Sequence, residues 1–250
     1  MQQPRNIKAE PNQAFVVSDF DGTLSPIVSD PRSAVFEEGA IEALLSLLDR
    51  YKTVGILSGR SSDFIKSQID RCSQKKELNA KKLKIYGFYG NEELTYDSDV
   101  LNLVASMADE LKHLLPDSVY VEYKFISVTL HYRNDESQFN NVKAISDTIL
   151  LKYTDFECLE GKKSIEIVPK TFKNKGDVIR DLLKTHQGGY YLGDDLGDLQ
   201  AFRVLKTNSN GTTCAVGVKS LDTPNEVVET VDLLLEGTKE AVTFLRELGA

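Results

Sequence analysis

The sequence predicts an α/β protein with a Rossmann-like, parallel-sheet core that is interrupted by an inserted α+β module. In the first and last thirds of the chain, short apolar runs alternate with segments of helical period. This pattern is typical of strand–helix–strand units joined by right-handed crossovers. The middle third instead repeats the order helix–strand–strand. With 250 residues, 41% of them hydrophobic, the chain can fill two separate cores.

The spacing of apolar residues gives the elements of the core. Each predicted helix carries apolar side chains three and four residues apart, and each predicted strand is a short apolar run. In chain order we expect a strand over 14–18, a helix over 37–50, a strand over 53–57, a helix from Ser62, a strand over 83–89, a helix over 175–184, a strand over 190–192, a helix over 198–206, a strand over 213–218 and a helix over 238–248.

The middle of the chain is predicted to be a module of its own, because its order of elements is αββαββ. We expect a helix over 100–115, strands over 119–123 and 126–132, a helix over 138–152, and strands over 155–159 and 163–168. We therefore divide the chain into a core of residues 1–93 and 170–250 and an inserted cap of residues 94–169.

Composition and charge exclude several classes of protein. The net charge of −8 gives no overall basic surface for nucleic acid, although a local cationic cluster or a bound cation still allows an anionic substrate. No apolar run approaches the roughly 20 residues that span a bilayer. Residues 1–11 lack the apolar stretch of a signal peptide. The three widely spaced cysteines are typical of reduced thiols, so we expect a cytoplasmic protein without nucleic-acid or membrane partners.

Acidic and small polar residues follow the predicted core strands. Asp19 and Asp21 come directly after the first strand, Ser58-Gly-Arg60 after the second, and Asp194 with Asp195 after the strand at 190–192. In a parallel sheet these loops gather at the carboxyl edge, where ligands bind. Clustered carboxylates repel one another unless a cation lies among them. Carboxylate oxygens without His or Cys suit Mg²⁺.

This arrangement can carry out phosphoryl transfer. A carboxylate can attack phosphorus and form an acyl phosphate, with a metal ion offsetting the repulsion between two anions. A second carboxylate two residues further along an extended chain lies on the same side and can protonate the leaving oxygen. Ser58 and Lys175 can donate hydrogen bonds to phosphoryl oxygens. Each motif alone is common in turns and helix starts, but the four in this order predict a phosphatase.

The four motifs resemble those of the haloacid-dehalogenase (HAD) superfamily of phosphatases. They read Val-Val-Ser-Asp19-Phe-Asp21-Gly-Thr23, Ile-Leu-Ser58-Gly-Arg60, Asn-Lys175-Gly and Leu-Gly-Asp194-Asp195. The resemblance implies that Asp19 is the nucleophile and Asp21 the general acid/base. It implies that Mg²⁺ is held by Asp19, the Asp21 backbone carbonyl and Asp194, and that the phosphate is contacted by Ser58, Gly59 and Lys175. Arg60 would contact the substrate. Asp195 or Asp198 would support the site by orienting Lys175 or the waters on the metal.

The inserted module resembles the cap of the trehalose-6-phosphate phosphatase family, a type C2 cap placed between the second and third motifs. The resemblance covers essentially the whole chain. It is carried by Thr23-Leu-Ser-Pro-Ile27, by Glu122-Tyr-Lys-Phe-Ile-Ser-Val-Thr-Leu-His-Tyr-Arg133 and by Gly161-Lys-Lys-Ser-Ile-Glu-Ile-Val-Pro169. It implies that Glu122, Lys124, Arg133 and Glu166 bind the sugar.

The residues of the cap support that role on physical grounds. Glu122 and Lys124 lie two apart, so on a strand they share a face; Arg133 comes from the next strand and Glu166 from a later one. A face with donors and acceptors in alternation suits a polyhydroxyl ligand. The alternative is a solvated face with cross-strand ion pairs, which we favour for Glu122 and Lys124 taken alone. We expect His131, on the strand that leads to Arg133, to be structural.

Two loops depart from the family pattern. After Gly193-Asp-Asp195 the family has Thr-Asp-Glu and then an aromatic residue, whereas this chain has residues 196–202, with Asp198 and Phe202 kept. After the third strand the family has Gly-X-His-Gly, for which we take Gly90-Asn-Glu-Glu93. We expect these changes to affect loop contacts to the sugar rather than the phosphate chemistry.

The resemblance implies a Mg²⁺-dependent hydrolysis of trehalose 6-phosphate to trehalose and phosphate, in trehalose biosynthesis. It also allows a functional link to a trehalose-phosphate synthase. Two alternatives stay open: a phosphatase for another sugar phosphate, such as mannosyl-3-phosphoglycerate or sucrose 6-phosphate, and a catalytically silent sugar-phosphate sensor on the same fold. The presence of both Asp19 and Asp21 favours the enzyme.

Overall fold

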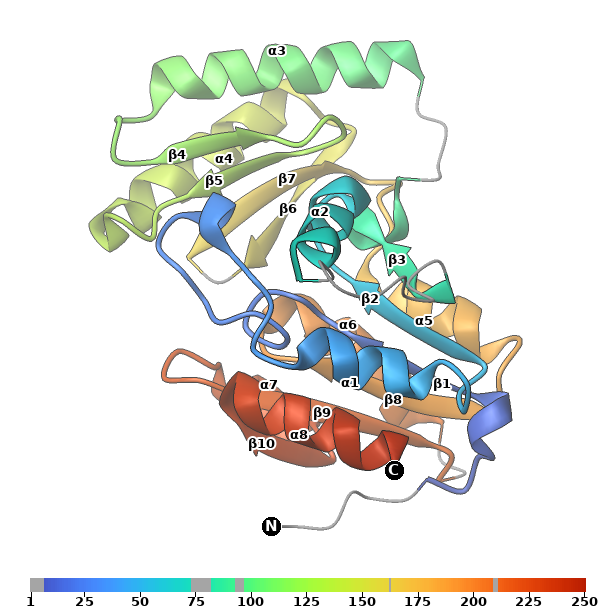
Figure 1. The fold of residues 1–250 in the computed structure, drawn as a ribbon. Helices are drawn as coiled ribbons and strands as arrows, with labels where there is room; N and C mark the ends of the chain where they lie inside the picture. Colours follow the sequence, from blue (N-terminus) through green and yellow to red (C-terminus); the bar gives the residue numbers. More distant parts are fainter. Residues whose placement is uncertain (1–6, 73–81, 93–96, 162, 209–210) are drawn as a thin grey trace. The chain divides into compact units, whose positions relative to one another are not determined.

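The computed structural model describes residues 7–72, 82–92, 97–161, 163–208 and 211–250 (Figure 1). The chain forms two compact units. The core unit comprises residues 1–92 and 173–250, and the inserted unit comprises residues 93–172. The sequence placed the insertion at 94–169, and the predicted boundary residue Glu93 lies outside the described residues.

The core unit is built on a six-stranded sheet with the order β10-β9-β8-β1-β2-β3. Every neighbouring pair is parallel, as the alternating pattern predicted. The strands are β1 (Ala14–Ser18), β2 (Thr53–Leu57), β3 (Lys84–Tyr86), β8 (Gly188–Gly193), β9 (Thr213–Lys219) and β10 (Leu233–Glu236). Because β1 lies between β2 and β8, the loops that leave these three strands meet at one edge of the sheet.

Helices cover both faces of this sheet. Alternate side chains of β1 enter two apolar clusters: Ala14 and Val16 face one cluster, and Phe15 and Val17 face the other. The first cluster includes residues of α1 (Ala40–Leu47), α2 (Ser62–Cys72) and α8 (Gly237–Gly249), and the second includes residues of α5 (Lys175–Leu183), α6 (Leu199–Thr207) and α7 (Asn225–Thr230). The core is therefore a three-layer α/β structure.

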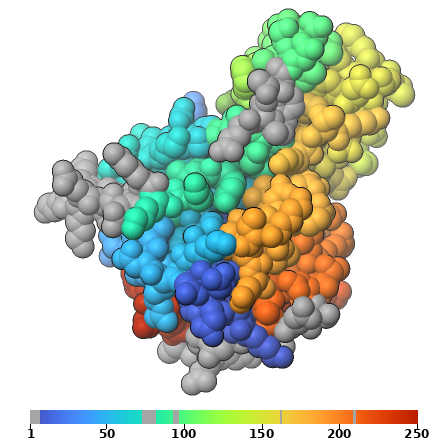
Figure 2. All heavy atoms as spheres, turned by 90° about the vertical axis from the view of Figure 1, so that its right-hand side faces the viewer, coloured from blue at the N-terminus to red at the C-terminus, as the bar shows by residue number. Residues whose placement is uncertain are grey.

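The chain segments before and after the inserted unit pack together as one structural unit. The Gln187 N–H donates to the Gln13 carbonyl at 2.9 Å, and the Lys52 ammonium donates to the Thr185 carbonyl at 2.6 Å. Figure 2 shows the dark blue N-terminal segment beside the orange segment that leads into β8. The two parts of the core unit thus complete a single sheet and its covering helices.

The inserted unit has the predicted αββαββ order and a core of its own. Its elements are α3 (Ser98–Leu114), β4 (Tyr120–Tyr123), β5 (Val128–His131), α4 (Phe139–Lys152), β6 (Phe156–Gly161) and β7 (Ser164–Pro169). The four strands pair antiparallel in the order β4-β5-β7-β6. Val128 and Leu130 of β5 pack with Val104 and Leu111 of α3, so the other face of the sheet carries the residues between them.

Several elements differ from the sequence-based expectation, among them α1, which covers Ala40–Leu47 rather than 37–50. Neither α7 nor β10 was predicted, and β3 ends at Tyr86 rather than at residue 89, because a 3₁₀ turn over Gly87–Gly90 follows. Within this turn Phe88 and Tyr89 both have positive φ. No helix in the described part of the chain combines the length and apolar character that crossing a bilayer requires.

Candidate active site

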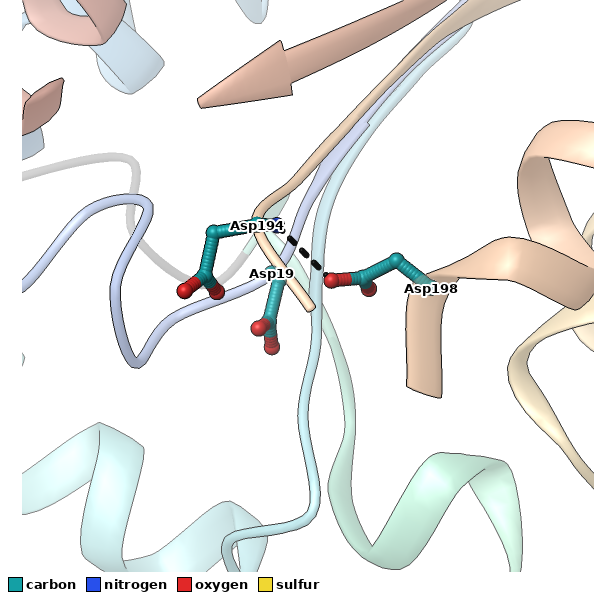
Figure 3. A group of neighbouring side chains, drawn as sticks. All are labelled: Asp19, Asp194 and Asp198. Atoms are coloured by element: carbon teal, nitrogen blue, oxygen red, sulfur yellow. Dashed lines mark hydrogen bonds between the residues drawn. The ribbon is translucent and has the colours of Figure 1, made fainter. Parts of the chain in front are cut away.

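Three aspartates from two loops converge at the carboxyl edge of the core sheet. Asp19 follows β1, Asp194 follows β8, and Asp198 ends the 3₁₀ turn Leu196–Asp198. One carboxylate oxygen from each lies within 4.8 Å of the others, and all three side chains are buried (Figure 3). The Asp19 N–H donates to the Leu192 carbonyl at 2.8 Å, so pairing between the strands fixes the position of Asp19 relative to β8.

Gly22 allows the loop after β1 to approach Asp194. Its φ is +82°, a left-handed conformation that residues with a Cβ rarely adopt. A Cβ at this position would also overlap the Asp194 carboxylate. The glycine therefore serves both the turn and the close contact between two acidic loops.

Asp198 anchors the cluster, because its carboxylate accepts four hydrogen bonds. Donors are the Lys175 ammonium at 2.6 Å, the Tyr191 hydroxyl at 2.5 Å, and the backbone N–H groups of Asp194 at 2.8 Å and Asp195 at 3.0 Å. Burial alone raises the pKa of the Asp198 carboxyl, but Lys175 and these hydrogen bonds hold it below its ordinary value. Asp198 is thus an ionised, fully engaged group that ties β8 and the loop after it to Lys175.

Lys175 bridges two of the aspartates. It begins α5, where Asn174 and Asp177 form a capping box, and its ammonium lies 3.1 Å from Asp19 and 2.6 Å from Asp198. Burial by itself lowers the pKa of this ammonium, but the charges of Asp19 and Asp198 outweigh it and raise the pKa well above the ordinary value. Lys175 therefore stays charged in an almost solvent-free position.

Negative charge exceeds positive charge within this cluster. Three carboxylates lie close together, and the Lys175 ammonium pairs with two of them, Asp19 and Asp198. Burial raises the pKa of the Asp19 carboxyl well above its ordinary value, and Lys175 opposes this only in part. Burial and the charge of Asp198 likewise raise the pKa of Asp195 to about 6. Such a site favours a bound cation, which would offset the charge excess.

The donor set fits a hard divalent cation. It consists of carboxylate oxygens without the sulfur or imidazole ligands that softer metals prefer. Because the Asp198 oxygens already accept hydrogen bonds from four donors, Asp19 and Asp194 are the members of the cluster best suited to hold the metal.

Asp21 makes a bidentate ion pair with Arg60. Both of its carboxylate oxygens accept from the guanidinium, each at 2.8 Å. The guanidinium also lies over the Phe64 ring, 4.8 Å from the ring centroid. The backbone N–H of Arg60 donates to the Ser58 hydroxyl at 3.1 Å. Arg60 thus lies on Asp21, and the substrate contact that we expect of it stays a prediction. Ser58 is buried beside it.

Tyr89, which we did not predict as a site residue, also reaches the site. The Tyr89 N–H donates to the Ser58 carbonyl at 2.9 Å, the Tyr89 hydroxyl lies against Gly59, and its ring centroid is 5.8 Å from the Lys175 ammonium. The buried Asn91 side chain fixes this loop to the backbone of Lys173. Gly87-Phe-Tyr-Gly90, directly before the rest of the 90–93 loop, also has the glycine spacing of Gly-X-His-Gly, with Tyr89 in the place of His.

Three of the four polar residues predicted in the inserted unit form a network: Glu122, Lys124 and Glu166. The Lys124 ammonium lies 4.0 Å from Glu122 and 3.4 Å from Glu166. Glu122 also pairs with the His131 ring at 2.8 Å, and the Ser127 hydroxyl donates to Glu166 at 2.6 Å. Arg133 lies two residues beyond the end of β5 and is partly exposed.

Comparison with known proteins decides the family. The sequence profile described as trehalose-phosphatase matches residues 17–78 and 84–230, well over half of the chain. The chain belongs to the trehalose-phosphatase family. This trehalose-phosphatase is therefore a hydrolase of the HAD superfamily, as its four motifs predicted.

Individual relatives agree with the family assignment. Trehalose-phosphate phosphatase B of Arabidopsis thaliana is 25% identical over 94% of this trehalose-phosphatase and 69% of its own length. The trehalose-phosphate phosphatase of Mycobacterium tuberculosis is 29% identical over 92% of this chain, which spans 63% of that relative. The C-terminal domain of trehalose-6-phosphate phosphatase from C. albicans has a TM-score of 0.73 at 22% identity, covering 96% of this chain and 92% of that domain. The last comparison confirms the predicted fold.

Proposed function

We propose that this trehalose-phosphatase hydrolyses trehalose 6-phosphate to trehalose and phosphate through a phosphorylated intermediate on Asp19. The observation that carries the proposal is the joint burial of Asp19, Asp194 and Lys175 at the meeting point of three loops. A nucleophile, a cation-binding carboxylate and a fixed ammonium are the groups that attack on a phosphate dianion requires.

Asp19 would act as the nucleophile. Its carboxylate oxygen forms a bond to phosphorus while the bond from phosphorus to the sugar oxygen breaks. Lys175, whose ammonium lies 3.1 Å from Asp19, would donate to a phosphoryl oxygen, and Ser58 and the Gly59 backbone are the other proposed phosphate contacts. Asp19, the Asp21 carbonyl and Asp194 would hold Mg²⁺, which supplies Lewis-acid stabilisation of the phosphoryl charge.

Asp21 would serve as general acid and then as general base. It gives a proton to the leaving sugar oxygen, and afterwards takes a proton from the water that attacks the phosphoryl group on Asp19. In the structure both Asp21 oxygens accept from Arg60, so this pair has to open before Asp21 can hold the proton that it gives to the sugar oxygen. Asp198 holds Lys175, and Asp195 caps the turn that carries Asp198.

The inserted unit would act as the cap that selects the sugar. Glu122, Lys124, Arg133 and Glu166 are its proposed sugar contacts, since two carboxylates and two cations can accept from and donate to several hydroxyl groups. The reaction would take place in the cytoplasm, where the free thiols of Cys72, Cys158 and Cys214 stay reduced, and would act on the product of a trehalose-phosphate synthase.

Phosphate release from a panel of sugar phosphates, with and without metal, tests this proposal. We expect trehalose 6-phosphate to have the highest kcat/KM, above sucrose 6-phosphate and mannosyl-3-phosphoglycerate. EDTA should abolish turnover and Mg²⁺ should restore it, with Ca²⁺ a poor substitute because its coordination is larger and less directional. Full activity after exhaustive chelation would contradict the mechanism. Higher activity on another sugar phosphate would change the substrate but not the chemistry.

A further inference from the structure

A threonine lies between two of the proposed sugar-binding carboxylates. Thr129 is on β5 and is directly opposite Glu122 of β4 on one side and Glu166 of β7 on the other. Residues directly opposite in antiparallel pairs have their side chains on the same face of the sheet. The neighbours of Thr129 in sequence, Val128 and Leu130, point into the apolar core of the inserted unit. The Thr129 side chain therefore lies on the polar face, in a row with both glutamates.

The Thr129 hydroxyl lacks a hydrogen-bond partner within the described part of the chain. The residue is only 2% exposed, and its Oγ1 atom neither donates nor accepts there. Its surroundings are polar and well paired, since Ser127 and Lys124 both contact Glu166. A buried hydroxyl without a partner is destabilising, and valine would fill nearly the same volume without that penalty. The retained hydroxyl thus requires a reason other than packing.

A sugar hydroxyl is the partner that this row is built to receive. The glutamates can only accept and Lys124 can only donate, whereas the threonine hydroxyl can do both. It can therefore donate to a sugar oxygen whose own proton goes to Glu122 or Glu166. We infer that Thr129 is a further sugar-binding, specificity-determining residue of this phosphatase. This inference rests on the proposed function and adds to it a residue that makes one hydrogen bond to the bound sugar.

Two substitutions at Thr129 separate binding from packing. T129V removes the hydroxyl and keeps the shape, whereas T129S keeps the hydroxyl and removes the methyl group. T212V is a matched control, because the Thr212 hydroxyl is also buried without a described partner but belongs to the core unit. Each purified Mg²⁺-loaded variant is measured for kcat/KM on trehalose 6-phosphate and on 4-nitrophenyl phosphate, and for its melting temperature.

The expected effects on stability and activity have opposite signs. T129V should melt at or above the wild-type temperature, yet lose about 3- to 10-fold in kcat/KM for trehalose 6-phosphate, the range of one hydrogen bond between neutral groups. Its kcat/KM for 4-nitrophenyl phosphate should stay within about twofold of wild type. T129S should keep the sugar activity and melt lower. T212V should keep both activities.

Three outcomes would overturn the inference. If T129V hydrolyses trehalose 6-phosphate as wild type does, water alone satisfies the hydroxyl. If T129V loses activity equally on both substrates, Thr129 supports the fold or the phosphate site. If T129S is as impaired as T129V on the sugar, the methyl group is what matters. A wild-type chain that prefers another sugar phosphate corrects only the proposed substrate, and the ratio of T129V to T129S on that sugar then decides the role of Thr129.

Discussion

The two polar clusters of this molecule contain similar residues but differ in charge balance and burial. In the core unit, Asp19, Asp194 and Asp198 lie close together, and the Lys175 ammonium pairs with Asp19 and Asp198; these three paired side chains are each 7% exposed or less. In the inserted unit, Lys124 lies between Glu122 and Glu166, with His131 as a further partner of Glu122. The Glu122 and His131 side chains are about a quarter exposed, at 25% and 24%, whereas those of Lys124 and Glu166 are 11% and 8% exposed.

This difference indicates different tasks. Excess negative charge in a buried site is costly and is best balanced by a bound metal ion, so we expect each member of the cluster to be essential to the chemistry. A nearly balanced and partly exposed network can lose one member and keep its fold, because water and the other residues compensate. Substitutions in the core cluster should therefore abolish turnover on every substrate, whereas those in the inserted unit should change selectivity by degrees.

The largest expected effect tests the core cluster. Asp19→Asn keeps the volume of the side chain but removes the nucleophilic oxygen, since an amide cannot form the acyl phosphate. Turnover should fall by roughly 10⁴-fold or more on both trehalose 6-phosphate and 4-nitrophenyl phosphate, measured as phosphate release. Substantial activity in this variant would mean that water attacks phosphorus directly, and that Asp19 only binds the metal.

A smaller effect, dependent on the leaving group, is expected at Asp21. Asp21→Asn should slow hydrolysis of trehalose 6-phosphate by roughly 10²-fold or more, because the sugar oxygen needs a proton as it leaves. The single-turnover rate with 4-nitrophenyl phosphate should fall much less, because nitrophenolate leaves without one. Arg60→Met removes the bidentate pair with Asp21. It should also slow hydrolysis of trehalose 6-phosphate more than that of 4-nitrophenyl phosphate, with a fold-loss about a tenth of that in Asp21→Asn. Arg60→Lys should restore part of the lost rate. Equal losses on both substrates in Asp21→Asn would contradict its role as the acid.

Most of the fold could be predicted because the core strands are short apolar runs separated by turn residues. The two missed elements carry weak local signals. In α7 only Val227 is buried and the helix has six residues, too few for a period to be visible. The apolar run in β10 contains three leucines, which fit a strand or a helix equally well. Tyr86 to Gly90 resembles a strand by composition, but positive φ at Phe88 and Tyr89 turns the chain there.

For the candidate site, the sequence could predict which loops meet but not how their side chains pair. Strand order determines the meeting of Asp19, Asp194 and Lys175, and strand order follows from topology. The pairing of Arg60 with Asp21 depends on the mutual register of two loops that lie 39 residues apart. Tyr89 was missed for the same reason. The orphan hydroxyl of Thr129 is visible only once β4, β5 and β7 are in register.

In the inserted unit, removal of a single charge should give intermediate and selective losses. Glu122→Ala and Arg133→Ala should each lower kcat/KM for trehalose 6-phosphate by roughly 5- to 150-fold, as expected when a buried polar group of the bound sugar loses its partner. Hydrolysis of 4-nitrophenyl phosphate, which has no sugar, should change by much less. If neither variant has any effect, these residues are surface ion pairs, the alternative that the sequence left open. A loss shared by both substrates would instead assign them to folding.

The smallest expected effect concerns His131, which the sequence analysis treated as structural. Its Nε2 atom lies 2.8 Å from a Glu122 oxygen, and its ring stacks on Tyr120 with the centroids 5.7 Å apart. A donor fixed in this way orients the carboxylate without touching the sugar.

His131→Gln keeps an N–H group that can reach Glu122, so KM for trehalose 6-phosphate should stay within about twofold of wild type. His131→Leu keeps only the bulk, and KM should rise by about 3- to 10-fold with little change in kcat, the effect of one lost hydrogen bond on binding. Combining His131→Leu with Glu122→Ala should cost no more than Glu122→Ala alone, because the two residues would act through one carboxylate. Fully additive losses in the double variant would show that His131 acts independently of Glu122.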